Sequence, residues 1–178
     1  MASMDDTPML KEAFISPCGL FRPVLSRRWD NDLPTASFYG VNPSYADKKV
    51  NDPTVRKMFG FCVRLGYGGF RVGNLIPYRA TYVKDLKTVQ DPFGDYGNVI
   101  AHPALLHSDT HIAAWGNISK LPKHLRYREA EFAKFFEEKG IPLHCIGTTK
   151  NGHPKHPLMT GYNVPLTPWS LECLDTHK

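Results

Sequence analysis

The sequence lacks paired cysteines, long apolar runs and a leader-like end. Its cysteines, Cys18, Cys62, Cys145 and Cys173, form no C-x-x-C pair, so their spacing suggests neither a zinc site nor a disulfide framework. Four thiols match the ligand number of an iron–sulfur cluster, but Cys62 lies on an apolar helical face and Cys145 in an apparent strand, which favours reduced, buried thiols. With no bilayer-spanning run and no signal-peptide pattern, we expect a soluble, cytoplasmic protein without a membrane partner.

The sequence also has no internal repeat, no low-complexity linker and no dense block of lysine and arginine. At 178 residues it predicts a single domain over 1–178, with a loose start over residues 1–11, and we expect a monomer. The 42% hydrophobic and 22% charged residues are typical of a globular protein. A net charge of +5 and a pI near 9.0 mildly favour a polyanionic partner.

Short apolar runs broken by proline and glycine predict alternating strands and helices. Asp52 is a suitable N-cap before Pro53, and apolar residues follow at helical spacing as far as Gly66. Gly140 is a suitable stop for a second helix over residues 127–139. The expected strands cover residues 36–41, 70–76, 111–115 and 142–146, with an edge strand over residues 19–27.

The order of these elements gives two β-α-β units. We therefore predict an α/β fold: a single domain whose central, mostly parallel four-stranded sheet is flanked by helices on both faces. Ligands bind such sheets at the carboxyl ends of the strands. The unusual polar segments all follow strands there: residues 42–47, 74–81, 116–117 and 148–161.

Four segments, in this order, resemble the uracil-DNA glycosylase superfamily, and the first resembles its mismatch-specific uracil and thymine branch. Gly40–Pro43 resembles the Gly-Ile-Asn-Pro motif that positions the attacking water. Val72–Leu75 with Arg79–Thr81 resembles the strand whose asparagine reads the base edge. Ala114–Gly116 resembles a Leu-Trp-Gly strand end, and His156–Leu158 resembles the second catalytic motif, His-Pro-Ser-Pro.

The chain also resembles DUF1643, a family of small bacterial and phage proteins, over about residues 25–166. The residues that carry this resemblance are Asn42–Ser44, Asp52–Thr54 and Thr149–Leu158. Two positions depart from the glycosylase motifs: Leu158 stands where serine is usual, and Ser44 stands where the mismatch branch has glycine. Because of these departures, the family motifs do not define the substrate pocket of this chain.

The resemblance implies that Asn42 and one histidine perform the chemistry. The Asn42 side chain cannot abstract a proton at neutral pH, but its carbonyl can hold a water beneath the sugar. Asparagine before proline is also an ordinary turn device. Asp47, the nearest carboxylate, is either a general base or a solvated loop charge.

The same resemblance implies that the histidine donates a hydrogen bond to the departing base oxygen. His156 is the first choice and His153 is the reserve. Either histidine is alternatively a surface residue or, with His144, a rudimentary metal ligand. Because no recognised zinc spacing is present, we expect no metal and no other cofactor.

Binding a flipped base requires an aromatic or apolar wall, a base-edge reader, a wedge and phosphate contacts. The candidates for the wall and the reader are Tyr45, Phe59, Asn74 and His153, although Phe59 is more simply a core residue. The candidates for the wedge are Leu158 and Met159. The candidates for phosphate contacts, which are otherwise solvated, are Ser44, Lys48, Lys49, Lys150 and Lys155.

The sequence therefore predicts a monofunctional DNA glycosylase that excises a flipped-out pyrimidine and leaves an abasic site, in repair or in anti-phage defence. Uracil is the default base, and a hypermodified phage pyrimidine such as glucosylated hydroxymethylcytosine is an alternative. Two other functions stay open. One is a non-catalytic module that binds a nucleotide or modified base, and the other is an N-glycosidase of free nucleosides or nucleotides.

Overall fold

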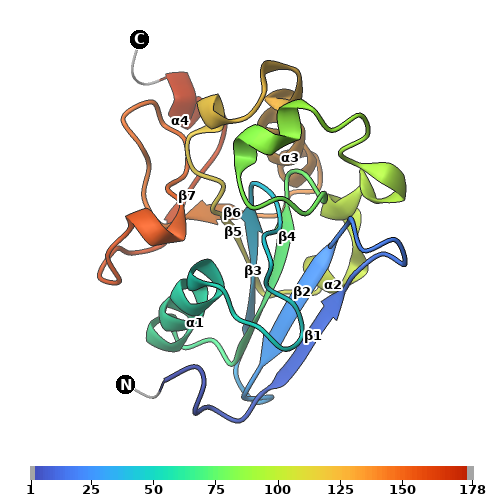
Figure 1. Ribbon diagram of the computed structural model, residues 1–178. Coiled ribbons are helices and arrows are strands. Elements are labelled where there is room, and N and C mark those ends of the chain that lie inside the picture. The colour runs from blue at the N-terminus through green and yellow to red at the C-terminus, as the bar shows by residue number, and fades with distance from the viewer. Residues whose placement is uncertain (1–2, 176–178) are drawn as a thin grey trace.

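One mixed sheet runs through the centre of the computed structural model, which describes residues 3–175 (Figure 1). Residues 1–2 and 176–178, which belong to the predicted domain span, lie outside this described part. The strands are β1 (Leu10–Phe14), β2 (Val24–Arg28), β3 (Thr35–Gly40), β4 (Gly69–Asn74), β5 (Thr110–Ala113), β6 (Leu143–Cys145) and β7 (Thr167–Pro168). Their order across the seven-stranded sheet is β1-β2-β4-β3-β5-β6-β7.

The four inner strands β4, β3, β5 and β6 pair in parallel, and β1, β2 and β7 add antiparallel edges. The α/β class is confirmed, but the prediction of four strands is wrong, since the sheet has seven. β1 begins at Leu10, inside the segment expected to be loose, and its pairing makes β2 an interior strand instead of an edge. β7 has two residues, one of them Pro168, which is too short for a recognisable strand pattern.

The helices follow the capping signals of the sequence. Asp52 caps α1 by accepting a hydrogen bond from the Val55 N–H at 2.8 Å, and Gly66 closes the helix at φ 80°. The α-helices are α1 (Pro53–Leu65), α2 (Pro103–Leu106), α3 (Tyr127–Glu138) and α4 (Glu172–Asp175). The 3-10 helices are η1 (Val83–Lys87), η2 (Gly94–Tyr96), η3 (Val99–Ala101), η4 (Ile118–Lys120), η5 (Lys123–Leu125) and η6 (Pro157–Met159). Within residues 3–175, no helix is long and apolar enough to cross a bilayer.

Two apolar cores lie on the two faces of the sheet. Phe38 of β3 packs with Met58 of α1 on one face, while Tyr39 packs with Phe132 and Phe136 of α3 on the other. Successive residues of a strand point to opposite faces, so β3 supplies both cores. Figure 1 shows α1 and α3 on opposite sides of the central strands, as predicted.

Only some of the cysteines are buried in the apolar cores. Cys62 and Cys145 are fully buried, and burial raises the pKa of both thiols. Cys18 is exposed. The prediction of buried thiols is therefore confirmed for Cys62 and Cys145 and wrong for Cys18.

A buried histidine on β5 makes the stability of this fold depend on pH. His111 is 4% exposed, its Nδ1 lies 2.9 Å from the Tyr39 hydroxyl, and burial, with His144 nearby, lowers its pKa to about 4. Unfolding returns this pKa to about 6.5, so the unfolded chain binds the proton more readily. The stability from neutral His111 is complete above pH 6.5 and is lost as the pH falls towards 4.

We expect His111 to account for a loss of about 2 kcal/mol in unfolding free energy between pH 7 and pH 5. Urea denaturation of the wild type and of His111→Asn at both pH values measures this contribution. The variant should lose less stability on acidification, whereas His124→Asn, at an exposed position, should behave as the wild type does. Parallel pH profiles for wild type and His111→Asn contradict this expectation.

Candidate functional site

A cavity of about 750 Å³ lies at the carboxyl ends of the parallel strands. Residues that follow β3, β4 and β5 line it, together with the first turn of α1 and the loop that carries η6. The polar residues of the lining are Arg22, Asn42, Ser44, Asp52, Thr54, Asn74, Thr81, Asn117, Lys120, Thr149, Lys155 and His156. Polar groups from distant parts of the chain therefore meet at one edge of the sheet.

The topology explains why the cavity forms there. From β3 the chain crosses to β4 through α1 on one face, and it then returns past β3 to β5 through segments packed on the other face. The connections thus leave in opposite directions at β3 and β5, which opens a crevice beyond their carboxyl ends. This crevice is the predicted position of the site.

Asn42 is fixed in the cavity wall by its amide nitrogen. Nδ2 donates to the Ala80 carbonyl at 2.8 Å and to the Pro43 carbonyl at 3.1 Å. Carbonyl oxygens only accept hydrogen bonds, so the nitrogen must face these partners, and Oδ1 remains as the acceptor. This orientation suits an asparagine that holds a water.

Asn74, at the end of β4, carries a polar group without a partner. The residue lines the cavity and is 3% exposed, and its buried Nδ2 has no hydrogen-bond partner within the described residues. The absence of a side chain at Gly40 makes room for it, because a Cβ there would lie 2.8 Å from Asn74 Oδ1. A buried amide without a partner is costly in a folded protein, and a hydrogen-bond acceptor on a ligand would remove this cost.

His156 is the N-cap of η6 and lines the cavity. Its Nδ1 accepts a hydrogen bond from the Leu158 N–H at 3.3 Å, which places the proton of the neutral ring on Nε2. Burial lowers the pKa of His156, Lys120 lowers it further, and Asp52 opposes the shift. At neutral pH the ring is therefore an uncharged donor through Nε2.

His153 makes a different contact, away from the cavity lining. Its Nδ1 lies 2.8 Å from Glu129 Oε1 on α3, and the same oxygen accepts a hydrogen bond from Trp115 Nε1 at 2.8 Å. Trp115 is itself part of the cavity wall. His153 thus ties the η6 loop to α3, and of the two histidines the structure brings only His156 to the cavity.

Asp47 also lies outside the cavity lining. Its Oδ1 accepts hydrogen bonds from the backbone N–H groups of Lys49 at 2.6 Å and Val50 at 2.9 Å. These bonds stabilise the carboxylate and lower its pKa. The structure therefore gives Asp47 the geometry of a turn residue.

The two aromatic candidates lie apart from the cavity lining. Phe59 is buried in the α1 core, with its ring centroid 4.8 Å from that of Trp29. Tyr45 is 67% exposed, and its hydroxyl accepts a hydrogen bond from Thr81 at 2.6 Å. Because Thr81 lines the cavity, Tyr45 lies beside the mouth without forming the wall.

The candidates for DNA contacts divide into two groups. The candidates that line the cavity are Ser44, Lys155, Leu158 and Met159. Leu158 and Met159 are 48% and 76% exposed, so they stand at its rim. The candidates that are exposed and lie outside the lining are Lys48, Lys49 and Lys150.

Three charged residues of the cavity were missed by the sequence analysis: Arg22, Asp52 and Lys120. The capping role predicted for Asp52 is confirmed. Because capping already explained this residue, the sequence offered no reason to expect it in the cavity wall as well. Arg22, between Phe21 and Pro23, and Lys120, in η4, carry no motif that marks them. Only the folded chain brings them to the strand ends.

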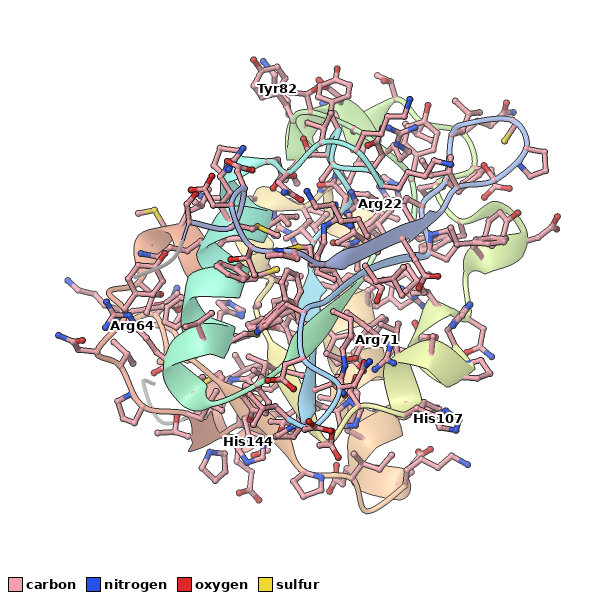
Figure 2. The ribbon with its side chains drawn as sticks, turned by 90° about the horizontal axis from the view of Figure 1, so that it is seen from below. Arg22, Arg64, Arg71, Tyr82, His107 and His144 are labelled. Carbon is pink, nitrogen blue, oxygen red and sulfur yellow. The ribbon has the colours of Figure 1, made fainter. Side chains whose placement is uncertain are left out.

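A second groove, of about 400 Å³, lies at the amino ends of the strands and includes Arg28, Arg71, His107 and Asp109. Figure 2 shows Arg71 and His107 on this side of the molecule. Three of its polar residues bind one another: Arg71 donates to Thr35 Oγ1 at 3.3 Å, and Asp109 accepts from the Thr35 N–H at 2.7 Å. The cavity at the carboxyl ends is therefore the stronger candidate.

The fold and the cavity define an α/β protein with a ligand-sized pocket at the carboxyl ends of a parallel core. Within residues 3–175, no group of three or more histidine, cysteine, aspartate and glutamate side chains is placed to hold a metal. Residues 22–158 match the model of a family described as protein of unknown function (DUF1643), and the chain belongs to this family. No curated protein and no solved structure matches the chain.

Proposed function

We propose that the chain is a DNA glycosylase that hydrolyses the N-glycosidic bond of a flipped-out pyrimidine. The observation that carries the proposal is that Asn42 and His156, from opposite ends of the sequence, line one cavity with the unpartnered amide of Asn74. Cleavage of this bond develops positive charge on the sugar and negative charge on the base. An acceptor for water and donors for the base match these needs.

Each residue has one role in this mechanism. Asn42 Oδ1 holds the attacking water, the Asn74 amide binds the base edge, and His156 Nε2 donates to the base oxygen as the bond breaks. Leu158 and Met159, exposed at the rim, fill the space that the flipped base leaves in the duplex. The protein supplies all these groups, so the mechanism needs no cofactor.

The size of the cavity favours a substituted pyrimidine over unmodified uracil. Its volume of about 750 Å³ lies in the upper part of the range for small-molecule sites, roughly 300–1,000 Å³. A hydroxymethylated or glucosylated cytosine uses more of this space than uracil does. This preference supports an anti-phage role over general repair.

Duplex oligonucleotides with one uracil, one G·T mismatch, one hydroxymethylcytosine or one glucosylated hydroxymethylcytosine test the proposal. After incubation, alkali cleaves the strand wherever a base has been removed. We expect cleavage at the substituted cytosine, and cleavage at uracil alone contradicts the proposed preference. Tight binding without cleavage of any duplex points to a non-catalytic module, and hydrolysis of free nucleosides alone points to a nucleoside hydrolase.

Lys120 and Lys155 line the cavity, and we expect both to contact DNA phosphates. Each phosphate contact contributes about 0.9 to the slope of log affinity against log salt concentration. The double variant Lys120→Ala, Lys155→Ala should therefore lower this slope by roughly one to two, as measured by fluorescence anisotropy. Lys134→Ala with Lys139→Ala, both exposed in the region of α3, is the matched control. Equal slopes in the two double variants contradict the assignment.

A further inference from the structure

The charges around the cavity are unequal in number. Among the described residues that line it, Asp52 is the one carboxylate, and it shares the lining with three cationic residues, Arg22, Lys120 and Lys155. A cavity with this balance attracts an anion such as DNA. A carboxylate within it works against that attraction, and helix capping alone does not require the charge, because asparagine or serine can also cap a helix.

Arg22 places a buried positive charge in the cavity lining. The residue is 3% exposed, its Nη1 donates to the Ala46 carbonyl, and its Nε has no partner within the described residues. Burial lowers the pKa of Arg22 to about 10, and Asp52 opposes this shift, so the guanidinium stays charged at neutral pH. Figure 2 shows Arg22 well inside the outline of the molecule, whereas Tyr82 projects at the periphery.

Asp52 is held at the first turn of α1. One carboxylate oxygen, Oδ1, accepts the Val55 N–H at 2.8 Å. Pro53 at the first helical position fixes the chain direction there. Asp52 also lines the cavity, and because the capping bond uses Oδ1, the carboxylate keeps acceptor capacity for a second partner.

We propose that Asp52 is the carboxylate that takes the proton from the attacking water, an inference that rests on the proposed glycosylase function. The water oxygen bonds to the sugar C1′ as the bond from C1′ to the base nitrogen breaks and its electron pair leaves with the base. Asp52 accepts the proton released by the water. The base anion accepts a hydrogen bond from His156 Nε2 and then takes a proton from solvent.

This assignment gives the two tasks of water activation, orienting the water and accepting its proton, to two different residues. Asn42 orients the water but has no basicity at neutral pH, and Asp47 lies outside the cavity lining with two backbone bonds on one oxygen. Asp52 adds the missing proton acceptor from a rigid helix end. Its charge also stabilises the cationic sugar.

Asp52→Asn separates this role from helix capping. Asparagine caps helices as well as aspartate does, so Oδ1 still accepts the Val55 N–H and the melting temperature should change little. We expect kcat for base release to fall about 100-fold or more with KM nearly unchanged, because the amide still orients water but cannot take its proton. Asp47→Asn is the matched control and should retain the wild-type rate.

Chemical rescue adds a readout that a structural role does not produce. Sodium formate should restore part of the rate to Asp52→Ala but not to Asn42→Ala, because formate supplies a carboxylate and not an amide. Base release by Asp52→Asn at the wild-type rate, or failure of formate to rescue Asp52→Ala, overturns the proposal. If the wild type releases no base from any duplex, the glycosylase function fails and the role of Asp52 fails with it. An active wild type with an equally active Asp52→Asn overturns only the role of Asp52.

Discussion

Replacing His156 by alanine is expected to lower the single-turnover rate of base release by about 100- to 1,000-fold. In the proposed mechanism the neutral ring donates through Nε2 to an oxygen that becomes negative only as the bond breaks, so its loss should weaken the transition state more than the bound substrate. DNA affinity, measured by anisotropy with an uncleavable duplex, should therefore change much less than the rate.

The control for this experiment is His124→Ala, since His124 is exposed and lies outside the cavity lining. It should retain the wild-type rate. His153→Ala tests the alternative histidine: it removes the contact with Glu129 and should lower thermal stability more than it lowers the rate. A rate for His156→Ala within threefold of the wild type, with His153→Ala inactive at full stability, contradicts the assignment.

Replacing Asn42 by alanine is expected to reduce base release by about 100-fold, because in the proposed mechanism the attacking water loses the acceptor that orients it. The change also removes the hydrogen bond to the Ala80 carbonyl, which should cost about 1 kcal/mol of unfolding free energy. Single-turnover kinetics measures the first effect, and urea denaturation measures the second.

Asn151→Ala is a suitable comparison, since Asn151 is exposed on a loop outside the cavity lining. It should leave the rate and the stability close to those of the wild type. If Asn42→Ala loses the expected stability but keeps the wild-type rate, Asn42 is a turn residue with no part in catalysis.

The inner part of the fold was predictable because its signals are local. The apolar run before Asn42 predicted β3, and the Asp52 cap with apolar residues at helical spacing predicted α1. The outer strands were not predictable in this way, because their formation depends on pairing with a neighbouring strand. β1 alternates exposed and half-buried residues and becomes a strand through its pairing with β2, which no local pattern reveals.

The site shows the same division. Segments that follow strands were predictable as the borders of the cavity, so Asn42, Asn74 and His156 were named from the sequence, and all three line it; their roles stay a prediction. Arg22 reaches that cavity by a long-range contact with the loop at Ala46, and the capping signal of Asp52 gave a complete local explanation for a residue that also lines the cavity. Tertiary contacts, which the sequence does not display, bring these charges together.

The glycosylase function predicts that a pyrimidine leaves the DNA as an intact free base. The most direct measurement is mass spectrometry of the small molecules released from duplexes with uracil, hydroxymethylcytosine or glucosylated hydroxymethylcytosine, alongside a count of abasic sites. We expect free base in equal amount to abasic sites with the wild type, and a strong reduction of both with Asn42→Ala and His156→Ala. Bound DNA that yields neither free base nor abasic sites with the wild type contradicts it.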